Sequence, residues 1–212
     1  MNAGPERLAL AGPAGTLEAV REAPAGAPRG LALLCHPHPL HGGTLDNKVV
    51  QTLARALRAC GWCTLRFNFR GVGASQGQWD GGRGEVDDAL AAVAALRAPG
   101  QPLVLGGFSF GGYVAAQAAQ RLAEPAQRLV LIAPATGNFD LPPVPQDSLV
   151  VHGDCDEVVP LAATLAWARP QALPIVVVPG GGHFFHGQLP LLKSIVMRAF
   201  ATGGARLEDR ST

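Results

Sequence analysis

The stretch LVLGGFSFGGYVAAQ, residues 103–117, decides the fold. It begins with a short apolar run, passes through the pattern G-x-S-x-G at residues 107–111, and continues into a segment whose apolar residues have helical spacing. A strand that turns sharply into a helix is the context in which this pattern lifts a serine hydroxyl clear of a sheet, and glycines are needed where a Cβ would not fit. The stretch therefore predicts a nucleophile elbow with Ser109 at its tip.

A second match to the same pattern, GASQG at residues 73–77, lacks this context. The preceding apolar run ends near Phe69, and the residues after Gly77 have the composition of a loop. We therefore interpret Ser75 as part of a surface turn and not as a nucleophile.

Short apolar runs bounded by Gly or Pro alternate with longer segments of helical periodicity along most of the chain. The predicted strands are residues 31–35, 63–67, 103–108, 129–133, 149–152 and 175–178. The predicted helices are residues 46–59, 85–96, 111–122, 160–168 and 189–201. This alternation predicts an α/β fold with a mostly parallel, doubly wound sheet covered by helices on both faces. Residues 7–11 and 16–21 are expected to add an antiparallel edge, and the polar residues 206–212 are expected to fray.

The composition of the 212 residues predicts a single globular domain spanning residues 1–212. Lys and Arg number 17 against 16 Asp and Glu, and these charges are interspersed, which disfavours nucleic-acid and membrane partners. The longest apolar run, residues 89–96, is too short to span a bilayer, and the first residues do not have the pattern of a secretory signal. We expect a cytoplasmic protein with four reduced cysteines, and the sequence leaves its oligomeric state open.

A serine nucleophile needs a base and a group that orients the base. His183 follows the last predicted strand in GGGHFF, on the rim where an open parallel sheet carries its reactive groups, whereas His186 is expected to cap or pack near the final helix. The loop HGDCDEVVP at residues 152–160, the acid loop, offers three carboxylates for the orienting role. These are Asp154, Asp156 and Glu157.

The loop HPHPLHGG at residues 36–43 is the expected source of one oxyanion donor, the other being the backbone N–H of Phe110. Proline has no N–H, which leaves the N–H of His38 or Leu40, and we favour His38. The three histidines of this loop also invite a metal site, but no further ligand stands at a convincing spacing, so we predict no metal and no cofactor. Cys155 lacks an elbow and is interpreted as a packed thiol.

Taken together, the HPHPLHGG loop, the FNFRGVGAS segment at 67–75, the Ser109 elbow, the acid loop and GHFF at 182–185 resemble the serine α/β-hydrolases. The likeness is to their small lidless bacterial group and covers residues 30 to 190 or so. The resemblance implies hydrolysis of esters or related acyl compounds through a triad, and it selects Asp156 over Asp154 as the acid. Dienelactone hydrolases are similar in size but carry cysteine at the elbow, where this chain has Ser109.

The substrate expected from these residues is a small-molecule ester with a short acyl chain. The connection at residues 134–146 is rich in proline and too short for a cap domain, so the cleft should be shallow. Phe139, Leu141 and the pair Phe184–Phe185 are the expected apolar walls. A thioesterase, lactonase or peptidase could use the same triad, and a catalytically silent ligand-binding module is the alternative outside the enzymes.

Overall fold

The computed structural model describes residues 4–201, in which one sheet holds eight strands in the order β1-β2-β4-β3-β5-β6-β7-β8. The strands are β1 (Glu6–Gly12), β2 (Gly15–Glu22), β3 (Leu31–Cys35), β4 (Cys63–Phe67), β5 (Leu103–Phe108), β6 (Arg128–Ile132), β7 (Leu149–Gly153) and β8 (Ile175–Val178). The helices are α1 (Lys48–Ala59), α2 (Arg83–Leu96), α3 (Phe110–Arg121), α4 (Leu161–Ala168) and α5 (Leu189–Ala201). Two 3₁₀ turns, η1 (Pro39–His41) and η2 (Arg169–Gln171), complete the elements.

The sheet topology confirms the predicted fold class. Strands β4, β3, β5, β6, β7 and β8 pair in parallel, and the hairpin of β1 and β2 joins β4 in antiparallel orientation, as expected for the edge. Predicted and observed elements differ by at most two residues at either end, but the two 3₁₀ turns were not predicted. The predicted fraying of residues 206–212 lies outside the described residues.

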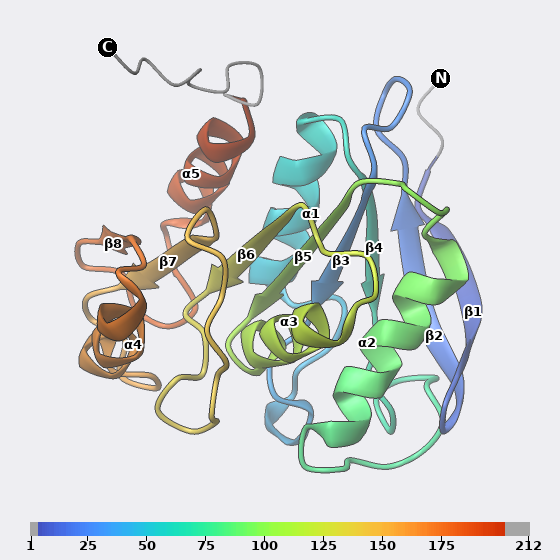
Figure 1. Ribbon diagram of the computed structural model, residues 1–212, viewed down its shortest axis with the longest axis horizontal. Helices are drawn as coiled ribbons and strands as arrows, with labels where there is room; N and C mark the ends of the chain where they lie inside the picture. Colours follow the sequence, from blue (N-terminus) through green and yellow to red (C-terminus); the bar gives the residue numbers. More distant parts are fainter. Residues whose placement is uncertain (1–3, 202–212) are drawn as a thin grey trace.

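Helices cover both faces of the sheet, which explains why its central strands are continuous apolar runs (Figure 1). On one face, Leu53 of α1 and Val196 of α5 pack in the same core as Val104 of β5. On the other face, α2, α3 and α4 pack through residues such as Ala89, Val114 and Ala168. Because successive side chains of a strand alternate between the faces, β5 contributes Leu105 to one core and Val104 to the other.

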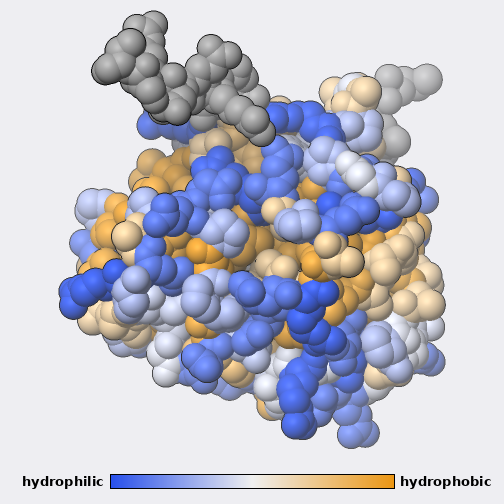
Figure 2. Space-filling model, in the orientation of Figure 1, coloured by the Kyte–Doolittle hydropathy of each residue, from blue (hydrophilic) through white to orange (hydrophobic). Residues whose placement is uncertain are grey.

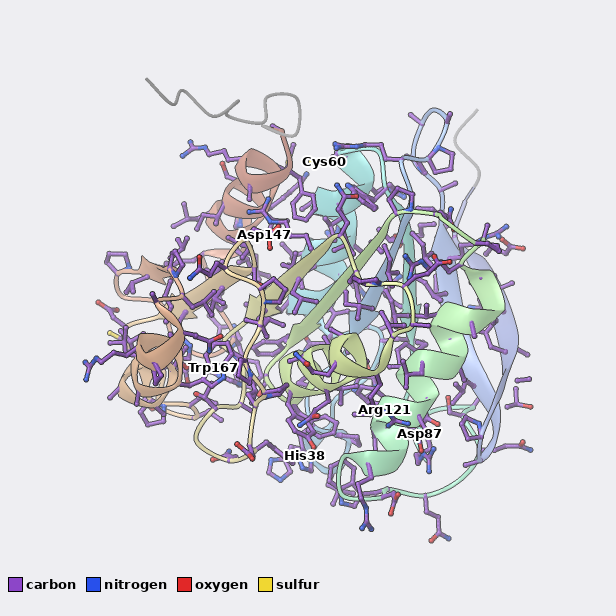
Figure 3. All side chains as sticks on the ribbon, in the orientation of Figure 1. His38, Cys60, Asp87, Arg121, Asp147 and Trp167 are labelled. Carbon is purple, nitrogen blue, oxygen red and sulfur yellow. The ribbon has the colours of Figure 1, made fainter. Side chains whose placement is uncertain are left out.

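The carboxyl ends of the parallel strands meet at one end of the molecule. Figure 3 shows His38, which follows β3, at this end, whereas Cys60 and Asp147, which precede β4 and β7, lie at the opposite end. An open parallel sheet binds ligands outside the carboxyl ends of its strands. The loops at this end are therefore where a site is expected.

The connection between β6 and β7, residues 133–148, contains turns and bends but no helix or strand. It contributes no cap domain. Figure 2 shows hydrophilic and hydrophobic residues interspersed over the face of α2, α3 and α4. Within residues 4–201, no helix is both long and apolar enough to cross a bilayer.

Candidate active site

Ser109 lies at the tip of a strained turn between β5 and α3. Its backbone has φ 55° and ψ −118°, a conformation that costs free energy and persists only where the surroundings enforce it. Its N–H donates to the carbonyl of Ile132 at 2.9 Å. A Cβ at Gly107 would collide with the backbone of Gly111, and a Cβ at Gly111 would collide with the backbone of Cys35. The G-x-S-x-G pattern is thus the set of residues that this turn can accommodate, as predicted.

His183 approaches this serine from the loop after β8. Its Nε2 lies 3.1 Å from Ser109 Oγ, and its ring packs between those of Phe108 and Phe184, at centroid distances of 4.8 and 5.0 Å. His186 is exposed, and its ring contacts that of Phe184 at a centroid distance of 5.7 Å. The structure therefore brings His183, and not His186, to the serine.

Asp156 completes a series of hydrogen bonds that begins at Ser109 and passes through His183. Its Oδ2 accepts from His183 Nδ1 at 2.7 Å, and its Oδ1 accepts from the N–H groups of Val158 and Val159 at 2.9 and 2.8 Å. Burial alone would raise the pKa of this carboxyl, but hydrogen bonds from His152, His183 and Val159 outweigh burial and hold the pKa well below its usual range. Asp156 is therefore ionised at neutral pH and fixes His183 with its proton on Nδ1, which leaves Nε2 to accept from Ser109.

The other candidates on the acid loop point elsewhere. Asp154 is exposed and accepts from the N–H of Gly180 at 2.6 Å, and Glu157 is exposed. Cys155 is also exposed, and a hydrogen bond to Asp154, with the charge of that carboxylate, raises the pKa of its thiol. Because the thiolate is the nucleophilic form of cysteine, this environment disfavours Cys155 as a nucleophile; its exposure also corrects our interpretation of it as a packed thiol.

The backbone N–H groups of His38 and Phe110, close to Ser109, have no acceptor within residues 4–201. Leu40, the other candidate donor, is engaged, because its N–H donates to His38 Nδ1 at 3.2 Å. The His38 ring is clamped by aromatic neighbours, with centroids 4.6 Å from Trp79 and 5.2 Å from Phe110. The geometry thus favours His38 over Leu40 as the second donor.

The histidines of the 36–43 loop have separate environments. His36 is buried, with Nδ1 2.7 Å from the carbonyl of Pro37 and Nε2 accepting from the N–H of Phe69 at 3.1 Å, so both of its ring nitrogens are occupied. His38 and His41 stack on each other at 4.6 Å. Among the described residues, no group of three or more His, Cys, Asp or Glu side chains is arranged to hold a metal ion.

A cavity of about 220 Å³ opens beside Ser109 and His183. His38, His41 and Asn47 contribute polar groups to its lining, and Val158 and Phe184 contribute apolar surface that is half exposed. Phe184 thus lies where it was predicted, and Val158 and His41 are pocket residues that the sequence analysis did not assign.

Three predicted wall residues are not part of this lining. Phe185 is fully buried in the core on the α1 and α5 side of the sheet. Leu141 is buried, and its carbonyl accepts from the indole N–H of Trp167, which draws the residue toward α4. Phe139 packs on Phe110 and Tyr113, at centroid distances of 5.1 and 4.8 Å. Our assignment of Phe139, Leu141 and Phe185 to the cleft is corrected accordingly, because Phe139 and Leu141 pack toward α3 and α4 and Phe185 packs into the core.

Ser75, the serine of the second G-x-S-x-G match, is buried, whereas we predicted a surface turn. Its Oγ donates to the carbonyl of Asn68 at 2.7 Å and accepts from the N–H of Glu18 at 2.9 Å. The hydroxyl joins the 68–77 loop to β2, so its role is structural.

Comparison with known proteins identifies the family. The sequence model of the serine aminopeptidase S33 family matches residues 27–147, which is more than half of the chain. The chain belongs to this family. The matched segment includes the elbow and the 36–43 loop, while Asp156 and His183 lie beyond it.

Solved structures of similar proteins extend the likeness over nearly the whole chain. XC6422 from Xanthomonas campestris, described as an α/β serine hydrolase without a lid, is 38% identical, with a TM-score of 0.85 over 95% of each chain. An α/β serine hydrolase homologue from Coxiella burnetii is 40% identical, with a TM-score of 0.82 over 93% of this chain and 97% of that one. An uncharacterized protein of Rickettsia prowazekii, RP471, is 40% identical over 70% of this chain, and the match spans 66% of that protein's length. The protein is a small lidless α/β serine hydrolase.

Proposed function

We propose that this protein is a carboxylesterase that cleaves esters of short acyl chains through Ser109, His183 and Asp156. The observation that carries the proposal is the continuous hydrogen-bonded chain from Asp156 through His183 to a serine held in a strained elbow. No cofactor is required by this chemistry, because the serine, the imidazole and the carboxylate supply the nucleophile, the proton carrier and its counter-charge.

The reaction runs in two halves. Ser109 Oγ attacks the ester carbonyl carbon while its proton passes to His183 Nε2, and collapse of the tetrahedral intermediate expels the alcohol, which takes that proton. Water then attacks the acyl-enzyme, again losing a proton to His183, and the acid leaves as Ser109 regains its proton. The N–H groups of Phe110 and His38 are the proposed donors to the negative oxygen in both halves.

The pocket supports a preference for short acyl chains. A cavity of about 220 Å³ is small for a ligand site, and its apolar surface is limited to residues such as Val158 and Phe184. Each buried methylene contributes about 0.8 kcal/mol, so binding free energy stops improving once the chain extends past these residues into water.

The family's name raises aminopeptidase activity as a second candidate. An aminopeptidase must bind an α-ammonium group, which usually calls for a carboxylate near the nucleophile. Among the described residues that line the cavity there is no Asp or Glu, and Asp156 is already saturated by its own partners. The charge pattern favours an ester over a peptide with a free N-terminus.

The test is a series of p-nitrophenyl esters from acetate to palmitate, with alanine p-nitroanilide alongside. We expect kcat/KM to be highest for the short esters, little turnover of the anilide, and a fall of about four decades or more in Ser109→Ala. Phe184→Ala should flatten the dependence on chain length, whereas the matched variant Phe139→Ala should leave it unchanged. A monotonic rise through palmitate would contradict the short-chain proposal, and rapid cleavage of the anilide would favour the peptidase.

A further inference from the structure

His152, in strand β7, is fully buried and lies behind the triad, outside the cavity. Its Nε2 is 2.8 Å from the carbonyl oxygen of Val159 and 3.3 Å from Asp156 Oδ2. On the other side of the ring, Nδ1 is 3.2 Å from Thr164 Oγ1. The imidazole thus connects the acid of the triad to a hydroxyl group in α4.

The protons along this connection can be placed by elimination. The carbonyl of Val159 only accepts, so Nε2 of His152 carries a hydrogen and points it toward Val159 and Asp156. In the neutral imidazole Nδ1 then accepts, which requires the hydroxyl proton of Thr164. Thr164 has no second proton to give, so Thr136 donates to Thr164 Oγ1 at 2.8 Å. The chain therefore has one direction, from Thr136 to Asp156.

This chain begins beside the nucleophile and returns to it. Thr136 follows Ala135, whose N–H donates to the carbonyl of Ser109 at 3.2 Å. From Asp156 the connection continues through His183 to Ser109 Oγ. Hydrogen bonds thereby join the segment after β6, strand β7 and helix α4 to the elbow, and the backbone between Ala135 and Thr136 completes the connection.

We propose that His152 is a positioning residue for the reaction, acting through Asp156 and never touching the substrate. It restrains the acid loop at two points, because the single hydrogen on its Nε2 is shared between the carbonyl of Val159 at 2.8 Å and Asp156 Oδ2 at 3.3 Å, and the N–H of Val159 in turn donates to Asp156 Oδ1. The inference rests on the proposed function, because it assigns a role in the triad's chemistry.

The donation by His152 also sets how much negative charge Asp156 presents to His183. A carboxylate oxygen that loses one donor becomes a stronger acceptor for the other, so without His152 the imidazolium of His183 is held more tightly. The acid limb of the pH profile of kcat/KM, which reports loss of neutral His183, then moves to higher pH. A residue that merely fills space in the core would not move that limb.

The remaining titratable groups near His183 are the same in wild type and variants. They are Asp156, which contacts His183 directly, His38 and His41 across the cavity, His186 on the ring of Phe184, and the exposed Asp154, Cys155 and Glu157 on the acid loop. A difference between the pH profiles is therefore attributable to position 152.

The experiment compares His152→Phe, His152→Gln and Thr164→Val with wild type, using p-nitrophenyl acetate across pH 5–9. In His152→Phe the ring volume stays but both nitrogens go, and kcat should fall on the order of tenfold with little change in KM, because a charge-assisted hydrogen bond is lost outside the pocket. Its acid limb should move up by about half a pH unit. The side-chain amide in His152→Gln can reach the Nε2 position, so this variant should recover most of kcat and the wild-type limb.

Thr164→Val, which removes the hydroxyl that donates to His152 Nδ1 and so helps hold the ring, should show a smaller fall in kcat and a shift of the acid limb in the same direction. If His152→Phe does not fold, Thr164→Val is used to test the proposal. The proposal is overturned if the acid limb of the kcat/KM profile stays at its wild-type pH in every folded variant. It is also overturned if His152→Gln and His152→Phe lose the same amount of kcat. Failure of the proposed function is a different result: wild type itself would then not hydrolyse the ester, or Ser109→Ala would hydrolyse it as fast.

Discussion

The two G-x-S-x-G segments of this chain place the same residue types in two different settings. Around Ser109 the pattern joins a buried strand directly to a helix, and the hydroxyl faces an imidazole and a cavity. Around Ser75 the pattern lies in a loop, and the hydroxyl is used up by the backbone of Asn68 and Glu18. The difference teaches that reactivity comes from the elements that flank the motif and from partners on neighbouring strands, while the motif alone specifies only a tight turn.

The largest expected effect separates the two serines by activity. Ser109→Ala should lower kcat for p-nitrophenyl acetate by about four decades or more, because removal of a triad member leaves only binding and oxyanion stabilisation. Ser75→Ala should retain kcat within about twofold, since this hydroxyl is distant from the reacting atoms in the hydrogen-bond network. Steady-state kinetics on both variants measures this contrast. A comparable fall in kcat in the two variants would contradict the distinction between the two serines.

The second prediction sharpens the same contrast through the partner of the elbow. Asp156→Asn should lower kcat by about three to four decades, because the amide no longer fixes the tautomer of His183. Asp154→Asn is the matched control: it lies two residues away, is exposed, and should leave kcat nearly unchanged. If the Asp154 variant were the crippled one, our assignment of the acid would be wrong.

The third prediction concerns pH and the anchoring of the Ser75 loop. Burial, opposed in part by a hydrogen bond to the carbonyl of Pro37, lowers the pKa of His36 from its usual 6.5 to about 4, and its Nε2 holds the N–H of Phe69 at the start of that loop. Between these two values the unfolded chain binds a proton that the folded protein excludes, so stability falls as pH falls from 6.5 toward 4, by roughly 3 kcal/mol at most.

Urea unfolding at several pH values between 5 and 7 measures this slope in wild type and in His36→Phe. The variant has no imidazole to titrate at this position, so its free energy of unfolding should vary less with pH. The lowered pKa of Asp156 affects stability at lower pH, outside this range. The unfolded chain binds a proton at Asp156 near the usual pKa of an aspartate, whereas the folded protein binds it only at still lower pH. Parallel slopes for the two proteins would show that His36 is not the source.

The smallest expected effect reverses the roles of the two serines. Ser75→Ala leaves the N–H of Glu18 and the carbonyl of Asn68 without their partner, and should lower the free energy of unfolding by about 1–3 kcal/mol. Ser109→Ala removes a single hydroxyl that opens to the cavity, and should change stability by less than about 0.5 kcal/mol. Equal destabilisation would mean that the elbow serine is also a structural anchor.

Most of the sheet and the elbow could be predicted because local signals agree there. The 103–117 stretch is apolar, then glycine-rich, then helical, and each property depends on neighbours in sequence. His183 and the acid loop were found for a related reason, since each follows a short apolar run that forms a parallel strand ending at the same end of the sheet.

What could not be predicted depends on contacts between distant residues. Leu141 is apolar and close to Phe139 in sequence, but the indole of Trp167, 26 residues away, fixes where it goes. His152 belongs to an apolar run and so gave only the signal of a buried strand; its contacts with Thr164 and Asp156 arise from the packing of β7 against α4 and the acid loop. Burial of Ser75 likewise depends on β2, more than fifty residues earlier.

The most direct test of the central claim is covalent labelling of the nucleophile. The intact protein is treated with a fluorophosphonate, and the modified residue is located by peptide mass spectrometry in wild type, Ser75→Ala and Ser109→Ala. The account predicts one label per chain, on the peptide containing Ser109, in wild type and Ser75→Ala, and none in Ser109→Ala. A label on Ser75, or labelling that persists in Ser109→Ala, would contradict it.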